Sequence, residues 1–146
     1  MSVHKSTLTW SRNGRDFNYK AYSRDHLWQF ENGIEVPASA APDYLGNPQR
    51  IDPETALVAA LSSCHMLTFL WVASKRGFVV AHYRDEAVGV MTKNERGKAW
   101  VSKVTLAPHI EWSEQTPTAE ELAALHHAAH DDCFIANSVT TEIVIR

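Results

Sequence analysis

The chain has 146 residues, of which 45% are hydrophobic and 21% are charged, and its formal net charge is −3. A chain of this length can bury roughly 70% of its unfolded surface, so a core can form without a disulfide framework. The composition excludes disordered and collagen-like proteins. The chain has no basic block, which disfavours a nucleic-acid partner. We therefore predict a single domain over residues 1–146 that binds no nucleic acid.

The N-terminal residues contain no apolar core of a secretory signal. The longest apolar stretch, residues 56–73, approaches the length of a membrane span. It contains Ser, Cys, His and Thr side chains, and Glu54 and Lys75 lie close to its ends. We therefore predict a buried helix of a protein that lies outside the membrane, in the cytoplasm. In that reducing compartment two cysteines more often serve chemistry than architecture.

Short strands and a loop are predicted for the first third of the chain. Residues 7–11, 17–22 and 26–30 alternate in polarity or carry aromatic side chains, which predicts three antiparallel strands. Residues 33–50 hold three prolines and two glycines. This composition predicts a long loop, and loops of that length are often binding or lid segments.

A long helix is predicted from Asp52 to about Lys75. Asp52 can cap it, Pro53 suits its first position, and Glu54 faces the positive end of the helix dipole. Gly77 is a typical stop signal. Because the segment is apolar nearly all round, we expect it to lie in the middle of the molecule.

Two long strands, a second helix and a last strand are predicted for the remainder. Residues 78–93 and 98–112 alternate in polarity around a turn at 94–97. Thr118 and Glu121 form the pattern of a capping box at a helix start. Residues 138–146 have the composition of a strand. The predicted fold class is α+β, with antiparallel sheets packed on a long buried central helix and a second helix.

The two cysteines, Cys64 and Cys133, lie 69 residues apart, one in each predicted helix. That spacing excludes a C-x-x-C motif. Free cysteines are most often small buried apolar residues, and that interpretation stays open for both. If the fold brings them together, a peroxide can oxidise one to sulfenic acid and the other can resolve it to a disulfide.

A metal site is the alternative for the second helix. His126 and His130 are four residues apart, and Cys133 follows three residues later, so these three potential ligands share one helix face. The standard zinc-ligand motifs are absent. A metal-binding module that uses His126, His130 and Cys133 therefore remains the second hypothesis.

A reactive thiolate at Cys64 needs a cation, because the residue lies about three turns from the helix start and gains little from the dipole. Arg12, Arg15, Arg24 and Arg50 precede the helix, although most arginines are solvated surface charges. A carboxylate would be needed to orient the guanidinium, and Glu54 is the nearest candidate in sequence.

Two segments resemble the OsmC/Ohr family of thiol peroxidases. Residues 53–65, P-E-T-A-L-V-A-A-L-S-S-C-H, resemble the P-E-x-L-x-A-A-x-x-x-C helix start of that family. Residues 129–138, A-H-D-D-C-F-I-A-N-S, resemble its second-cysteine segment. The order of the predicted strands and helices fits the same family over nearly the whole chain.

The resemblance implies an intertwined homodimer with active sites at the subunit interface, and reduction of organic hydroperoxides without a bound cofactor. Hydrogen peroxide is a second implied oxidant, and an external dithiol resets the enzyme. Carried over by position, Cys64 matches the peroxidatic cysteine, Cys133 the resolving cysteine and Glu54 the glutamate of the family. Arg24, in Y-S-R-D-H, matches the family arginine, with Arg15 as the rival.

Two departures concern the branch of the family. Phe134 follows the second cysteine where the organic-hydroperoxide branch has proline, and His65 follows the first where that branch prefers an aromatic residue. The chain therefore looks more like an OsmC-type or a generic OsmC-like member than a true Ohr protein. Four aromatic side chains are candidates for an apolar substrate pocket, although a core position is the commoner role for such residues: Trp28, Tyr44, Phe69 and Trp71.

Overall fold

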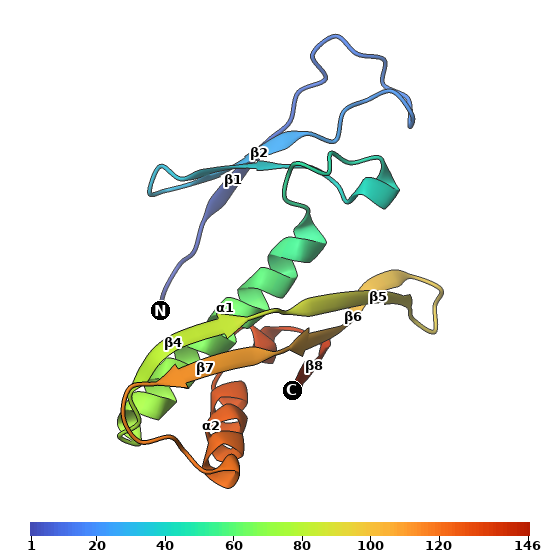
Figure 1. Ribbon diagram of the computed structural model, residues 1–146. Coiled ribbons are helices and arrows are strands. Elements are labelled where there is room, and N and C mark those ends of the chain that lie inside the picture. Colours follow the sequence, from blue (N-terminus) through green and yellow to red (C-terminus); the bar gives the residue numbers. More distant parts are fainter. The chain divides into compact units, whose positions relative to one another are not determined.

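In the computed structural model, which describes residues 1–146, three short strands near the N-terminus form one antiparallel sheet (Figure 1). They are β1 (Ser6–Thr9), β2 (His26–Phe30) and β3 (Glu35–Ala38), in the order β1-β2-β3. Leu8 pairs with Trp28, and Trp28 pairs with Val36 on the other side. The chain turns from β2 to β3 at Gly33, whose φ of 80° favours glycine.

Two predictions for this region are wrong. Residues 17–22 form turns rather than a strand, because the Asn18 carbonyl accepts the N–H groups of Ala21 and Tyr22 at 3.0 and 3.2 Å. The Asn18 side chain also accepts the Lys20 N–H, which is a typical asparagine turn. The predicted loop 33–50 contains β3 and a short 3₁₀ helix, Pro42–Tyr44.

Helix α1 (Pro53–Lys75) begins and ends where its capping residues predict. The Asp52 carboxylate accepts the Thr55 N–H at 2.8 Å and so satisfies one of the free donors of the first turn. At the other end Gly77 has a φ of 80°. The Phe78 N–H donates to Ala73 and the Gly77 N–H to Ser74, which together form a Schellman motif.

The remaining strands follow α1 in the chain and form two sheets. They are β4 (Val80–Asp85), β5 (Val88–Lys93), β6 (Ala99–Leu106) and β7 (Pro108–Trp112), followed by helix α2 (Ala119–Asp131) and β8 (Glu142–Ile145). β4 pairs with β7, and the second sheet has the order β5-β6-β8. β8 runs parallel to β6, whereas every other pair is antiparallel. The Thr118 capping box at the start of α2 is confirmed.

The two long predicted strands, 78–93 and 98–112, are each broken near the middle. Asp85 ends β4, and its carboxylate accepts the backbone N–H of Ala107, which lies between β6 and β7, at 2.6 Å. The other carboxylate oxygen accepts the Ser62 hydroxyl of α1. The Asp85 side chain at the first break therefore satisfies a backbone N–H at the second break and a hydroxyl of α1, and periodicity alone does not reveal such a bend.

Helix α1 packs on both sheets through two core clusters. The first half of the helix packs with the β5-β6-β8 sheet around Leu61, Val104 and Leu106. The second half packs with α2 and the β4-β7 sheet around Phe69 and Leu125. By length and composition α1 could cross a membrane, but one of its faces contributes to both clusters. The α+β class is confirmed, whereas the expected burial of α1 holds for that face only.

Burial of α1 is one-sided in the single chain. The buried side chains recur every three or four residues along one face: Leu61, His65, Phe69, Val72 and Ala73. Leu67 and Trp71 on another face are 60% and 54% exposed. The contacts divide the chain into two compact units, Met1–Ala56 and Leu57–Arg146. A single domain over residues 1–146 stays a prediction.

Candidate functional site

The structure brings Cys64 and Cys133 together. Cys64 lies in α1, and Cys133 lies just after the end of α2. The Ile135 N–H donates to Cys64 Sγ at 3.5 Å, and the Ala136 N–H donates to Cys133 Sγ at the same distance. Cys64 is also near enough to contribute to the raised pKa of Cys133. Both cysteines are free. Two side chains 69 residues apart in sequence therefore form one dithiol centre within the second unit.

A hydrogen-bonded turn fixes Cys133 after α2. The Cys133 N–H donates to the His130 carbonyl at 3.2 Å, and the Cys133 carbonyl accepts the backbone N–H of Asn137 at 3.0 Å. The Asn137 side-chain amide donates to the carbonyls of Asp131 and Cys133 at 2.8 and 3.0 Å. The Ala136 N–H points at Cys133 Sγ, 3.5 Å away. The turn thus aims two backbone N–H groups, those of residues 135 and 136, at the two sulfurs.

The dithiol centre lies between the two core clusters of the second unit. Along α1, Leu61 belongs to one cluster and Phe69 to the other, and Cys64 lies between them in sequence. On the other side of the centre, Ala129 of α2 packs in one cluster and Ile135 in the other. In both segments, each cysteine therefore falls between a residue of one cluster and a residue of the other.

The two thiols have different environments. Cys133 is 1% exposed, whereas Cys64 is partly exposed. Burial, and then the contact with Cys64, raise the pKa of Cys133 to about 11. Cys133 is therefore a protonated thiol at neutral pH, and Cys64 is the sulfur that solvent and ligands can reach.

An open pocket of about 530 Å³ lies against Cys64. Its lining comes from α1 and from the turn after α2: Cys64, Leu67, Thr68, Trp71, Asp132 and Phe134. Phe134 is 82% exposed, so this is a surface groove with apolar walls rather than a closed cavity. A pocket of this kind suits a small apolar ligand that brings a reactive group to a sulfur atom.

Of the four predicted pocket aromatics, Trp71 lines the pocket and Phe69 lies in the core with 0% exposure. Trp28 and Tyr44 belong to the first unit. The sequence analysis missed Leu67, Thr68, Asp132 and Phe134. Leu67, Thr68 and Trp71 follow Cys64 by three, four and seven residues, and this helical spacing was the available signal.

The histidines near the dithiol centre form a stacked pair rather than a metal site. His65 Nε2 lies 3.1 Å from His126 Nδ1, and the two rings are nearly parallel. Burial, and then the neighbouring His126, lower the pKa of His65 to about 4. No group of three or more His, Cys, Asp or Glu side chains is arranged to hold a metal ion. The structure therefore does not gather His126, His130 and Cys133 into one group of ligands, and the metal-binding alternative stays a prediction.

Arg24 is held within the first unit by its own neighbours. Its Nη1 donates to the Tyr22 carbonyl at 2.6 Å, and Nη2 donates to the Tyr19 carbonyl. The guanidinium carbon lies 3.8 Å from the centre of the Tyr22 ring. Glu54 lies in the first turn of α1. The rival, Arg15, is exposed, and its carbonyl accepts a hydrogen bond from Arg12.

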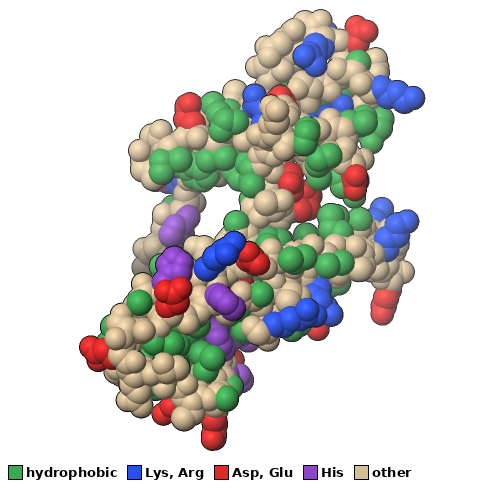
Figure 2. All heavy atoms as spheres, in the orientation of Figure 1, with side chains coloured by type: hydrophobic (Ala, Val, Ile, Leu, Met, Phe, Trp, Pro, Cys, Tyr) green, Lys and Arg blue, Asp and Glu red, His purple; other side chains and the backbone are tan.

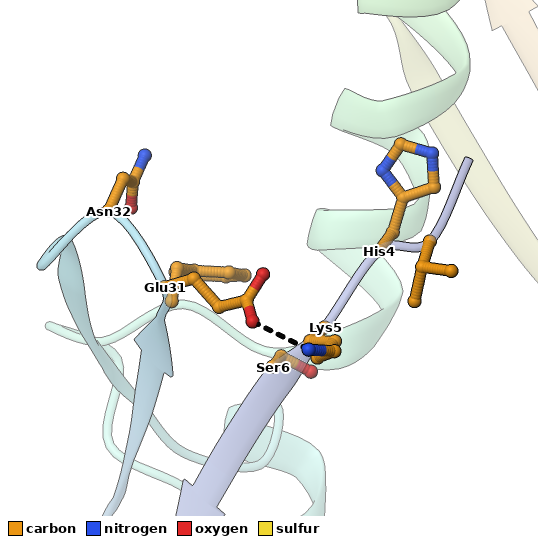
Figure 3. A pocket seen from close by; sticks show the side chains of 7 residues that line it. His4, Lys5, Ser6, Glu31 and Asn32 are labelled. Atoms are coloured by element: carbon orange, nitrogen blue, oxygen red, sulfur yellow. Dashed lines mark hydrogen bonds and ion pairs between the residues drawn. The ribbon is translucent and has the colours of Figure 1, made fainter.

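A second pocket, of about 510 Å³, lies in the first unit between the N-terminal residues and the end of β2 (Figure 3). Lys5 Nζ lies 2.9 Å from Glu31 Oε1, so the two charges that line it neutralise each other. Both side chains are about two-thirds exposed. Every side chain that lines this pocket is exposed, so it offers no buried polar group for chemistry.

Comparison with known proteins gives one family. A sequence profile described as OsmC-like protein matches residues 46–146. The chain is similar to the structure of an OsmC-like protein of unknown function from Vibrio cholerae, with 46% identity, a TM-score of 0.94 and coverage of 100% of this chain and 99% of that one. Comparison with curated proteins by sequence gives no match.

More distant structures share the fold. An organic hydroperoxide resistance protein from Elizabethkingia anophelis has 20% identity and a TM-score of 0.76, with 99% of this chain and 93% of that chain covered. An organic hydroperoxide resistance protein OsmC from Legionella pneumophila has 16% identity and a TM-score of 0.72, with 100% and 95% covered. At such identities the likeness shows the fold alone.

Proposed function

Since the chain belongs to the OsmC-like protein family, we propose that it is a cysteine-based peroxidase that reduces organic hydroperoxides. Solved relatives with this fold are named organic hydroperoxide resistance proteins. The observation that carries the proposal is that two free thiols lie near one another, held by the adjacent N–H groups of residues 135 and 136, and that Cys64 lines an apolar pocket. A merely architectural pair of cysteines needs no such pocket.

The proposed reaction consumes one hydroperoxide and one dithiol. The Cys64 thiolate attacks the outer oxygen of ROOH, the O–O bond breaks, and the alkoxide leaves and takes a proton to become the alcohol. Cys64 is then a sulfenic acid. Cys133 condenses with it, so that an S–S bond forms and water leaves. An external dithiol restores both thiols by exchange and becomes a disulfide itself.

The different environments of the thiols support the order of the two roles. Cys64 lines the pocket, so a hydroperoxide can reach its sulfur. The Ile135 N–H donates to the same sulfur, which would carry the negative charge of the thiolate. Cys133 is buried and its pKa is raised to about 11, so it is poorly suited to meet the oxidant first. It is well placed to condense with a sulfenic acid at Cys64.

Arg24 and Glu54 take their roles in this proposal from their positions in the family motifs. Arg24 supplies the cation that favours the Cys64 thiolate and stabilises the leaving alkoxide, and Glu54 orients the guanidinium. The hydrogen bonds and ring contacts of Arg24 support it over Arg15, because they hold a planar cation in one orientation. A lysine at position 24 would keep the charge and lose this geometry.

A homodimer is part of the proposal. In the single chain, β5 exposes Val88, Val90 and Met91, whose exposed fractions are 57%, 48% and 39%, and hydrophobic side chains gather along this strand in Figure 2. Contiguous exposed apolar side chains are typical of surfaces that a partner covers. We place the enzyme in the cytoplasm, where dithiol reductants keep it active, with hydrogen peroxide as a second oxidant.

Variants of the two cysteines test the function. The unmodified protein should consume cumene hydroperoxide at the expense of a dithiol. Cys64→Ser should lose this activity by at least about a thousandfold, as expected for loss of a nucleophile. Cys133→Ser should form sulfenic acid once, which a dimedone-type probe detects by mass spectrometry, and then turn over slowly. Undiminished turnover by Cys64→Ser would contradict the mechanism.

A further inference from the structure

The guanidinium of Arg24 is fixed in place by groups that carry no negative charge. Its hydrogen bonds go to the carbonyls of Tyr22 and Tyr19, which are neutral acceptors. In the single chain no carboxylate pairs with Arg24. The adjacent carboxylate, Asp25, pairs with Arg50 instead, whose Nε lies 3.3 Å from Asp25 Oδ2. The positive charge of Arg24 therefore stays available to an anion outside its own segment.

One face of the guanidinium lies on an aromatic ring. The guanidinium carbon of Arg24 is 3.8 Å from the centre of the Tyr22 ring and 5.1 Å from that of the Tyr19 ring. The face of an aromatic ring attracts a cation and leaves its charge in place. A carboxylate such as that of Glu54 contacts the edge of a guanidinium, so a carboxylate and a ring can act on Arg24 at the same time. The shorter distance makes the Tyr22 ring the main support of the cation.

The Tyr22 ring is held in turn by two other rings. Its centroid lies 5.2 Å from that of Phe17 and 6.2 Å from that of Trp10, and these two rings are 5.9 Å apart. The Trp10 indole N–H donates to the Ser23 carbonyl at 2.7 Å, between Tyr22 and Arg24 in the chain. Tilted and edge-on ring pairs at such distances stabilise each other beyond their buried area. The three rings therefore restrict the movement of the ring on which Arg24 lies.

We infer that Tyr22 is a positioning residue, whose ring holds the Arg24 guanidinium in the orientation that favours the Cys64 thiolate. The inference rests on the proposed function, which places Arg24 at Cys64, and adds a residue to that site. A cation that is already oriented stabilises developing negative charge without having to reorganise during the reaction. Tyr22 acts through Arg24 and takes no part in the oxygen transfer.

The pH dependence of Cys64 alkylation measures how strongly the cation favours the thiolate. Iodoacetamide reacts with the thiolate form, and a peptide map reports Cys64 separately from Cys133. In Tyr22→Leu the midpoint of the rate against pH should lie about one pH unit higher than in the unmodified protein, because a less oriented cation stabilises the thiolate less. Tyr22→Phe should restore the unmodified midpoint, because it keeps the ring face that the cation contacts.

Two controls separate this role from a general disturbance of the first unit. Phe30→Leu removes another aromatic side chain from that unit, and its midpoint should not move, since Arg24 lies over the rings of Tyr19 and Tyr22. Arg24→Gln should raise the midpoint by itself, and a second change, Tyr22→Leu, should then add no further shift. The titratable neighbours of Cys64 are the same in every variant: His65, Asp132 and Cys133.

Failure of the inference and failure of the function differ in this experiment. If Arg24→Gln leaves the midpoint unchanged, the proposed role of Arg24 fails and the inference fails with it. If Arg24→Gln raises the midpoint and Tyr22→Leu does not, the function stands and only the role of Tyr22 is overturned. A shift in Tyr22→Phe as large as in Tyr22→Leu, or a Tyr22→Leu shift that persists in the Arg24→Gln protein, overturns the inference as well.

Discussion

Helix α1 has two apolar faces, and their environments differ. Leu61, His65 and Phe69 face the sheets and α2 and are almost completely buried. Their near neighbours in sequence, Cys64, Leu67 and Trp71, point to another face of the helix and line the pocket. The comparison shows that an apolar helix face need not be core. On the proposed function, the apolar side chains of the pocket face bind the hydroperoxide rather than stabilise the fold.

Truncation of the buried face should have the largest effect on stability. The Phe69 ring packs on Tyr83, Trp112 and His126 at centroid distances of 5.7, 6.2 and 4.5 Å. Phe69→Ala should lower the free energy of unfolding by about 3–5 kcal/mol, because it leaves a cavity in a packed cluster. Denaturant unfolding of the variant measures this loss. A loss below about 1 kcal/mol would erase the distinction between the two faces.

Acid should weaken the same buried face through His65. The pKa of His65 is lowered from 6.5 to about 4 by burial and by His126, while Asp85 opposes the shift. Well above pH 6.5 the His65 ring is neutral in the folded and in the unfolded chain, so its titration costs no stability there. As the pH falls from 6.5 toward 4, the unfolded chain takes up a proton that the folded chain rejects, so stability falls by about 3 kcal/mol.

Thermal unfolding between pH 7 and pH 4 measures this dependence on acid. In His65→Gln the fall should be smaller, because the residue no longer titrates. His127→Gln is the control, since His127 lies on the exposed face of α2. Equal pH dependence in His65→Gln and the unmodified protein would show that His65 does not carry the effect.

The next largest loss of stability should follow from disturbing a close contact between α1 and β5. A Cβ atom at Gly89 would lie 2.4 Å from Val58 Cγ2, so the strand can approach the helix only with glycine there. Gly89→Ala should cost about 1–3 kcal/mol through overpacking. Gly33→Ala is the control for backbone strain, because its positive φ penalises alanine but nothing lies within 4 Å of the added atom. An unchanged free energy of unfolding in Gly89→Ala would show that the contact carries no cost, because Gly89 has no positive φ to add a backbone penalty.

The pocket face should show the smallest effect on stability. Leu67 is 60% exposed, so Leu67→Ala should change the free energy of unfolding by less than about 1 kcal/mol. On the proposed function it should raise KM for cumene hydroperoxide several-fold, because it removes an apolar wall of the pocket. Steady-state kinetics beside denaturant unfolding separates the two readouts. A large loss of stability with unchanged KM would place Leu67 with the core face.

Much of the fold could be predicted from local signals. The Asp52 cap, the Gly77 stop and the Thr118 capping box located both helices, because these residues satisfy backbone groups a few positions away. The strand predicted at 17–22 failed because Asn18 captures nearby N–H groups and closes turns. The break at Asp85 depends on a partner 22 residues away, which no local pattern contains.

The candidate site could be predicted only in part. The family motifs singled out Cys64 and Cys133, and the structure brings these two together. The pairing of His65 with His126 could not be predicted, because the two residues lie in different helices. The sequence pattern grouped His126 only with His130 and Cys133, on one face of the second helix. The position of Asp132 in the pocket could not be predicted either, since it depends on how the turn after α2 meets α1.

A count of free thiols tests the central claim most directly. The reduced protein, freed of reductant, is mixed with one equivalent of cumene hydroperoxide per chain, and the thiols that remain are titrated under denaturing conditions. The account predicts two titratable thiols before the addition and none after it, with a dithiol restoring both, and a peptide map that shows Cys64 joined to Cys133. Two thiols still titratable after the hydroperoxide would contradict it.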